Sequence, residues 1–309
     1  MEFSVIEASR PSFCWHLRTR QLELGERTLL MAIVNLTPES VSSHGVTGGR
    51  AWPAAASAKV ALAEAVEAMD SGADIVELGS AATRTGAQTV SADEECARLL
   101  PVLEGLLLAR PQAVVAVDTC HAATARAAAR AGAQILKDVS GLTWDTEMAE
   151  TVARSGCGVV LMHARGRVRE SLAQGPMSRD EIVPQVFAGL CESVAIAEAA
   201  GIDDERMAVD PGFGFGKRSA ENFRLLAQLG RLHQLRLPLL VGLSRKGFLG
   251  EAVKDVQPVG LHKADARRLA TVAGNVAAVL SGAHILRVHD VQAAREAVAV
   301  ADAVLSAAN

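Results

Sequence analysis

Residues 114–138 read VVAVDTCHAATARAAARAGAQILKD, and this stretch contains the unit that decides the fold. Two short apolar runs, Val114–Asp118 and Ile135–Asp138, flank an Ala-rich segment of the composition that helices prefer. Neither run alternates apolar with polar residues, which indicates strands buried on both faces of a parallel sheet. The stretch is therefore predicted to be one strand–helix–strand unit.

The same alternation of short apolar runs and Ala-rich helical segments extends over the whole chain. Six further runs fit the pattern: Leu30–Asn35, Ile75–Leu78, Gly158–Met162, Met207–Asp210, Leu239–Gly242 and Ile285–Val288. Eight such units favour closure into a (β/α)8 barrel, here a single domain over residues 1–309, and the rival is an open doubly wound sheet. Residues 13–29 precede the first strand and predict a β-hairpin plug for the amino-terminal end of the barrel, with its turn near Leu24-Gly25-Glu26.

Composition excludes several classes of protein. The net charge of −4 and the isoelectric point near 6.1 provide no polycation for nucleic acid. Charged residues and glycines break the apolar stretches before the roughly 18 residues of a membrane span, and the start of the chain does not resemble a signal peptide. The five cysteines are odd in number and form no C-x-x-C pair, so we expect free thiols in a reducing cytoplasm.

Polar residues follow several of the predicted strands directly. The residues that end or follow strands are Asn35, Asp118, Asp210, Ser244, Lys246, Arg287 and His289. A carboxylate at the end of a strand can simply cap the next helix. Closure of a barrel, however, brings all these strand ends into one mouth, which is where barrel enzymes hold their active sites.

The residue types suit a small anionic substrate. Arg287 and His289 lie two apart on one strand, so they point the same way and can donate to phosphate oxygens. Asn35 carries the kind of neutral oxygen that Mg²⁺ accepts when it bridges phosphates. Asp118 and Asp210 could accept from the N–H groups of a planar heterocycle, and Lys246 could donate to a carbonyl or a carboxylate.

The glycine-rich run of residues 212–217 does not have the spacing of a phosphate-binding loop, because Arg218 stands where that motif needs a hydroxyl. We interpret the run as a loop whose backbone approaches a ligand and whose Phe213 and Phe215 pack on it.

The strings MAIVNLTPES, VAVDT, DPGFGFGK, LLVGLSRK and RVHD, in this order, resemble the dihydropteroate synthase family from about Trp15 to the C-terminus. The resemblance implies a (β/α)8 barrel that joins 6-hydroxymethyl-7,8-dihydropterin pyrophosphate to p-aminobenzoate with Mg²⁺, and a homodimer formed through the late helices. It implies these roles: Asn35 for Mg²⁺; Asp118, Asp210 and Lys246 for the pterin; Arg84, Arg287 and His289 for the pyrophosphate; Thr83, Phe215 and Ser244 for the aminobenzoate; Lys137, Met162 and Gly242 for the remaining substrate contacts.

The departures from the family pattern fall on the same face. Lys137 stands where the family usually has Asn, and Glu77 stands where it has Asp. The two loops near the mouth differ at Val41, Ser43, Ala81, Ala82 and Thr85. Four readings stay open: a divergent synthase whose Lys137 pairs with a carboxylate, a remodelled pocket with lost or changed activity, amine catalysis by Lys137, and a pterin carrier. Pterin-binding methyltransferases are the runner-up enzyme class, although nothing in the chain resembles a corrinoid-binding module.

Overall fold

The computed structural model describes residues 10–36, 54–79, 90–166, 175–178, 180–256 and 267–308. Its centre is an eight-stranded parallel sheet in the order β8-β7-β6-β5-β4-β3-β10-β9. The strands are β3 (Leu29–Asn35), β4 (Ile75–Gly79), β5 (Val115–Asp118), β6 (Ile135–Asp138), β7 (Gly158–Met162), β8 (Met207–Asp210), β9 (Leu240–Val241) and β10 (Ile285–Val288). A parallel bridge between Val209 and Leu239 joins the two outer strands. The sheet is thus closed, and the predicted barrel is confirmed.

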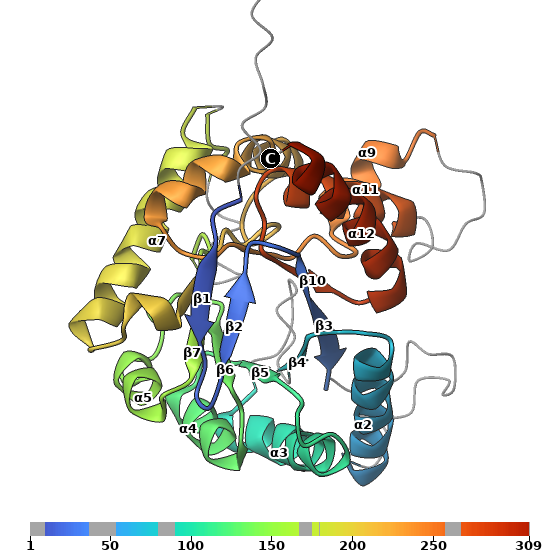
Figure 1. Cartoon of the computed structure of the whole chain (residues 1–309). Coiled ribbons are helices and arrows are strands. Elements are labelled where there is room, and N and C mark those ends of the chain that lie inside the picture. The colour runs from blue at the N-terminus through green and yellow to red at the C-terminus, as the bar shows by residue number, and fades with distance from the viewer. Residues whose placement is uncertain are drawn as a thin grey trace, which may run out of the picture.

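Helices surround the barrel (Figure 1). They are α2 (Ala54–Asp70), α3 (Ala92–Ala109), α4 (Ala122–Ala131), α5 (Met148–Ser155), α7 (Ile182–Ala199), α8 (Ser219–Ala227), α9 (Gly247–Val253), α11 (Arg268–Leu280) and α12 (Val291–Ala308), with 3-10 turns η1 (Asp204–Arg206) and η2 (Leu229–Leu235). The Ala-rich α4 ends at Gly132, whose φ of 113° lets its N–H reach the carbonyls of Ala128 and Ala129. This helix end turns the chain back toward the next strand.

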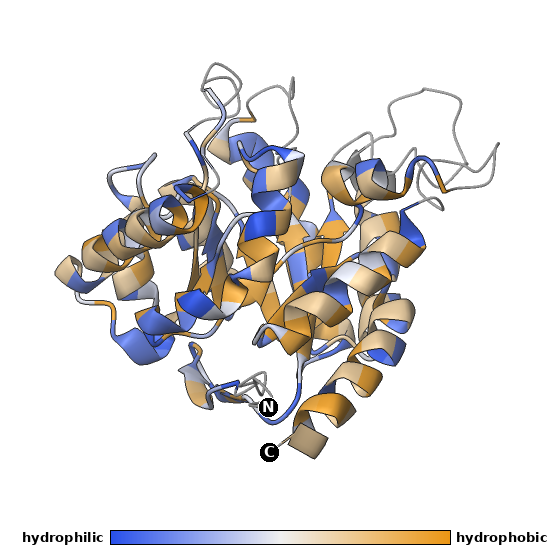
Figure 2. Ribbon diagram, turned by 90° about the horizontal axis from the view of Figure 1, so that it is seen from above, coloured by the Kyte–Doolittle hydropathy of each residue, from blue (hydrophilic) through white to orange (hydrophobic). Residues whose placement is uncertain are grey.

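Alternate strand residues face the two sides of the barrel wall. The inward set forms a core of its own: Met31, Ile75, Ala116, Ile135, Val160, Ala208, Leu240 and Ile285. The outward set, such as Leu30, Val76 and Leu136, packs with apolar residues of the helices in a larger cluster. Seen from above, the strands form an apolar centre within the layer of helices (Figure 2). Burial on both faces explains why the strands lack alternation in sequence.

The hairpin plug exists, but its turn lies elsewhere than predicted. β1 (Phe13–His16) pairs antiparallel with β2 (Gln21–Leu24), and the turn spans residues 17–20, where the N–H of Leu17 donates to the carbonyl of Arg20 at 2.8 Å. The prediction near Leu24-Gly25-Glu26 was wrong because Gly25, at φ 122°, turns the chain out of the hairpin toward β3. Trp15 is fully buried among the inward core residues, so the hairpin closes this end of the barrel.

One described helix, α7, is long and apolar enough by composition to cross a membrane. Its buried residues, which include Val183, Val186 and Leu190, belong to the same core cluster as the outward strand residues. A core helix of a water-soluble domain passes the same test, so this is weak evidence for a membrane segment.

Candidate functional site

Strand register brings the predicted residues to one level of the barrel mouth. Asn35 pairs with Gly79, Gly79 pairs with Asp118, and Asp118 pairs with Lys137 on four successive strands. Met162 likewise pairs with Asp210. Because residues in register on parallel strands point to the same side of the sheet, these side chains share the inward face with Arg287 of β10. The mouth is therefore assembled from strands that are far apart in the sequence.

Four charged side chains form a buried cluster there, the ion quartet Glu77, Asp118, Lys137 and Arg287. Arg287 Nε donates to both oxygens of Glu77 at 2.9 and 2.8 Å, and its Nη2 also bonds Glu77. Asp118 Oδ2 lies 3.6 Å from Arg287 Nη2 and 3.3 Å from Lys137 Nζ. Two anions thus face two cations, and a single oxygen of Asp118 is shared by both cations.

Burial makes this charge balance matter. The Glu77 and Lys137 side chains are 0% and 2% exposed. Burial alone would raise the pKa of Glu77, but Arg287 and Lys137 outweigh it and hold the pKa below its usual value. The pKa of Asp118 is raised, because burial and the neighbouring Glu77 exceed the effect of the two cations. Glu77 is therefore the firm counter-ion of Arg287, while Asp118 is the less stabilised carboxylate.

His289 is held by Ser244 at the end of β10. The N–H of residue 289 donates to Ser244 Oγ at 3.2 Å, and the same hydroxyl lies 2.9 Å from Nδ1 of the ring. Burial, with Arg245 and Arg287 nearby, lowers the pKa of His289 to about 3, so the imidazole is neutral. A hydroxyl has one proton and two acceptor lone pairs, so this contact fixes the orientation of the ring and is compatible with either neutral tautomer. With the ring proton on Nε2, His289 offers that N–H to a ligand.

Asp210 and the glycine-rich loop after β8 are braced by buried polar residues. Asp210 Oδ1 accepts from the N–H of Gly212 at 2.7 Å. Lys217 Nζ donates to the carbonyls of Gly212 and His163 at 2.8 and 3.2 Å, and Asn222 Oδ1 accepts from the N–H of Gly214 at 2.7 Å. Because Lys217 is only 7% exposed and points at backbone oxygens, it shapes the loop.

Lys246 lies against this loop. Its Nζ stands 4.3 Å from the centre of the Phe215 ring, a cation–π contact. Burial, then Arg287, lowers the pKa of Lys246 to about 8, and both Asp210 and Asp118 act on it in the opposite direction. The ammonium form therefore prevails at neutral pH, and Lys246 lies within electrostatic reach of Asp118, Asp210 and Arg287.

The other predicted residues have mixed outcomes. Met162 is buried at the end of β7, and Gly242 lies beside Arg287, whose Cδ would be in ordinary van der Waals contact, at 3.5 Å, with a Cβ at that position. Asn35 is half-buried at the end of β3. Thr83 and Arg84 lie outside the described residues, as do the family departures Val41, Ser43, Ala81, Ala82 and Thr85.

Two contacts were not foreseen from the sequence. Glu77 stood out only as a departure from the family, yet it is the partner of Arg287. Glu95, on the first turn of α3, is fully buried and accepts from Thr119 Oγ1 at 2.6 Å, which ties the helix to the residue after Asp118. An acidic residue in the first turn of a helix is common, so its spacing gave no signal of this contact.

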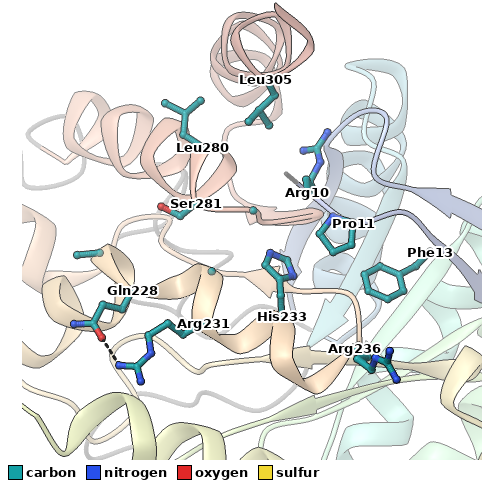
Figure 3. Close-up of a pocket in the computed structure, with 13 residues that line it drawn as sticks. Arg10, Pro11, Phe13, Gln228, Arg231, His233, Arg236, Leu280, Ser281 and Leu305 are labelled. Carbon is teal, nitrogen blue, oxygen red and sulfur yellow. Dashed lines mark hydrogen bonds between the residues drawn. The ribbon is translucent and has the colours of Figure 1, made fainter. Parts of the chain in front are cut away.

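A cavity of about 780 Å³ lies away from the quartet, between the start of the chain, η2 and the last helices (Figure 3). It is lined by Arg10, Phe13, Arg231, His233 and Leu305, among others. Since Phe13 belongs to the plugging hairpin, this cavity is at the amino-terminal end of the barrel. It contains no residue of the predicted site.

Comparisons with known proteins agree with this geometry. The family described as "Pterin binding enzyme" matches residues 31–289. Dihydropteroate synthase of Escherichia coli strain K12 is 37% identical over 279 residues, which cover 90% of this chain and 92% of the relative. A structure of the Xanthomonas albilineans dihydropteroate synthase with 4-aminobenzoic acid has a TM-score of 0.81 and 36% identity, covering 95% of this chain and 98% of that one. The Yersinia pestis enzyme, in a sulfonamide drug complex, has a TM-score of 0.83 and 34% identity, covering 95% and 100%. The chain belongs to the dihydropteroate synthase family of pterin-binding enzymes.

Proposed function

We propose that this chain joins 6-hydroxymethyl-7,8-dihydropterin pyrophosphate to p-aminobenzoate and releases pyrophosphate. The observation that carries the proposal is the gathering of Asp118, Asp210, Lys246 and Arg287 within electrostatic reach of one another in a barrel mouth. Carboxylates can bind the donor edge of the pterin, and cations can bind the pyrophosphate. The 4-aminobenzoic acid in the Xanthomonas albilineans structure supports the second substrate.

Each residue has a role in binding. Asp118 and Asp210 accept from the amino and ring N–H groups of the pterin, and Lys246 donates to its carbonyl oxygen. Arg287 uses Nε and Nη2 on Glu77, so its remaining N–H groups serve the pyrophosphate together with His289 Nε2. Arg84 joins them, Thr83, Phe215 and Ser244 border the aminobenzoate, and Met162 and Gly242 line the rest of the pocket.

The chemistry needs no protein nucleophile. The bond between the pterin methylene carbon and the pyrophosphate oxygen breaks, and its electron pair leaves with the pyrophosphate. The resulting cation is delocalised over the pterin ring, and the aniline nitrogen attacks the methylene carbon and loses a proton to water. Arg287 and His289 stabilise the charge on the leaving group, and the carboxylates hold the ring in place, so positioning and electrostatics supply the catalysis.

The residues present fit a Mg²⁺ ion that is held mainly by its substrate. Among the described residues no group of three His, Cys, Asp or Glu side chains could hold a metal, and Asn35 offers one amide oxygen at the end of β3. Mg²⁺ typically keeps few protein ligands when phosphate oxygens supply the rest. Asn35, together with oxygens of the pyrophosphate, would hold the ion, and the ion would supply neutralisation of the charge of the leaving group.

Contacts of Lys137 argue against amine catalysis. A nucleophilic amine must reach the carbonyl carbon of a substrate, whereas Lys137 Nζ is held by Asp118 at 3.3 Å and its side chain is only 2% exposed. The pairing of Lys137 with a carboxylate favours the divergent synthase.

Pyrophosphate release tests the function. The assay contains the pterin pyrophosphate, p-aminobenzoate and Mg²⁺, with turnover expected only when all three are present. In Arg287→Ala/His289→Ala the affinity for pyrophosphate should fall, because each charge-assisted bond contributes about 1.5–3 kcal/mol. Leu108→Ser, at an 86% exposed position of α3, is a control that should leave it unchanged. Equal affinity in the double variant would show that the pyrophosphate does not bind at the end of β10.

We also propose a cytoplasmic homodimer. Leu269 on α11 and Val300 and Val304 on α12 are large apolar residues with 77%, 64% and 52% exposure. A second copy packed on α11 and α12 would cover them, and the five free cysteines suit a reducing compartment. Light scattering should report a dimer that Val300→Asp/Val304→Asp converts to a monomer, and a monomeric wild type would refute it.

A further inference from the structure

The glycine-rich loop after β8 folds around one buried ammonium group. Lys217 Nζ donates to the carbonyls of Gly212, His163 and Phe215 at 2.8, 3.2 and 3.4 Å, and the residue is 7% exposed. Two of these oxygens belong to the loop, and the third belongs to the residue that follows β7. Lys217 therefore cross-links the loop to the barrel.

Glycines make this arrangement possible. Gly212, Gly214 and Gly216 all have positive φ, at 66°, 78° and 70°. A Cβ on Gly212 would stand only 1.9 Å from the carbonyl oxygen of His163, which is the oxygen that Lys217 also contacts. Since side chains are excluded from such a position, the backbone of the loop can come close enough to β7 for one cation to bond both.

The position of Phe215 depends on the same contacts. Its carbonyl accepts from Lys217, and its N–H donates to the carbonyl of Gly212 at 3.1 Å, so both sides of this residue are tied to the cross-link. Its ring lies 4.3 Å from Nζ of Lys246, one of the cations of the barrel mouth. A shift of the loop would thus move the ring relative to the mouth.

We propose that Lys217 is a positioning residue for the second substrate, because its ammonium holds the Phe215 ring at the place where p-aminobenzoate binds. Lys217 has three donors and uses them on three backbone oxygens, so it acts through the loop. This role rests on the proposed function, in which the aminobenzoate lies beside Phe215. The pterin instead depends on Asp118 and Asp210 at the ends of strands, so loss of Lys217 should affect the two substrates unequally.

Steady-state kinetics and calorimetry separate the two substrates. Lys217→Met keeps the length of the side chain and removes its donors. At saturating pterin pyrophosphate it should raise KM for p-aminobenzoate by about ten-fold or more, since a hydrogen bond from a charged group contributes at least that factor. The dissociation constant of the pterin pyrophosphate should change by less than about three-fold, the effect of one weak neutral hydrogen bond.

Arg206→Met is the matched control. Arg206 is also a cation that donates to three backbone carbonyls, those of Val152, Ala153 and Cys157. It precedes β8, whereas the glycine-rich loop follows that strand, so it lies at the other end of the barrel. Its loss should lower the urea midpoint of unfolding and leave KM unchanged, which separates positioning from a general loss of stability.

The pH dependence is a second measurement, which a purely structural role would not produce. Burial lowers the pKa of Lys217 to about 7. The charged groups that act on it are Lys246 and Arg165, which lower its pKa further, and Asp210 and Glu221, which raise it; the neighbouring His163 is neutral. KM for p-aminobenzoate should therefore rise as pH increases through 7, because the neutral amine is a weaker donor, and this rise should be absent in Lys217→Met.

Several results would overturn this inference alone. They are an unchanged KM in Lys217→Met, a rise in KM that is matched by an equal rise in the pterin dissociation constant, and a pH dependence that persists in Lys217→Met. A wild-type KM that stays constant through pH 7 overturns it without any variant. A wild type that binds the pterin pyrophosphate and forms no product with p-aminobenzoate overturns the proposed function together with the inference.

Discussion

Replacing Glu77 by Gln removes one charge from the quartet and keeps the size of the side chain. Glu77 is fully buried and bonded by two nitrogens of Arg287, so the amide leaves Arg287 and Lys137 facing the single carboxylate of Asp118. Breaking a buried ion pair from one side typically costs about 3–5 kcal/mol. We expect Glu77→Gln to lose about that much free energy of unfolding, a large part of the roughly 5–15 kcal/mol of a typical domain.

A second substitution tests whether the charge imbalance in the quartet causes this loss of stability. Lys137→Asn removes one of the two cations, so the double variant Glu77→Gln/Lys137→Asn leaves Arg287 against Asp118 and restores neutrality. Urea unfolding of the four proteins should give a double variant that is about 1–3 kcal/mol more stable than the sum of the single effects predicts. Glu77→Asp is the matched control that keeps the charge. Additive effects would refute the account of a balanced quartet.

Three further predictions concern neighbouring groups. Because burial lowers the pKa of Lys246 to about 8, pterin affinity measured by calorimetry should fall as pH rises through 8 and should not depend on pH there in Lys246→Met. Asp210→Asn should fold normally, since the amide oxygen can still accept from Gly212, but should weaken pterin binding by about 1–3 kcal/mol, and equal affinity would refute its role. Burial also lowers the pKa of four described histidines, His163 and His289 to about 3, His284 to about 4, and His233 in the same direction. These rings gain protons only in the unfolded chain between about pH 6.5 and 4, so stability should fall as pH drops through that range. Asp138, whose pKa burial raises to about 6, and Asp118, whose pKa is also raised, act in the opposite direction as two groups against four. Urea midpoints at pH 7 and 5 measure the difference, which should shrink in His284→Phe.

The barrel was predictable because its signal is local and repeated. A run such as Ile135–Asp138 is apolar because both faces of its strand are covered, and the structure has that strand with the predicted bounds. The hairpin turn was not predictable in the same way. Gly25 looked like a turn residue, but the turn at residues 17–20 depends on Gln134, which is distant in sequence and accepts from Thr19.

The candidate site was likewise predictable only in part. Residues at the ends of strands could be grouped from the sequence, because barrel closure brings strand ends together. The pairing of the charges could not be predicted, since Glu77 and Arg287 are 210 positions apart in sequence and meet only because β3 lies between their strands β4 and β10. The orientation of the His289 ring likewise depends on Ser244, which belongs to another strand end.

Product identification tests the central claim most directly. The chain is incubated with pterin pyrophosphate, Mg²⁺ and p-aminobenzoate labelled with ¹⁵N in its amino group, and the products are separated and weighed by mass spectrometry. The account predicts one product that contains the pterin and the labelled nitrogen, formed together with an equal amount of pyrophosphate and lost in Arg287→Ala/His289→Ala. Hydrolysis would contradict it: the products would then be pyrophosphate and hydroxymethylpterin, and all of the label would remain in free p-aminobenzoate.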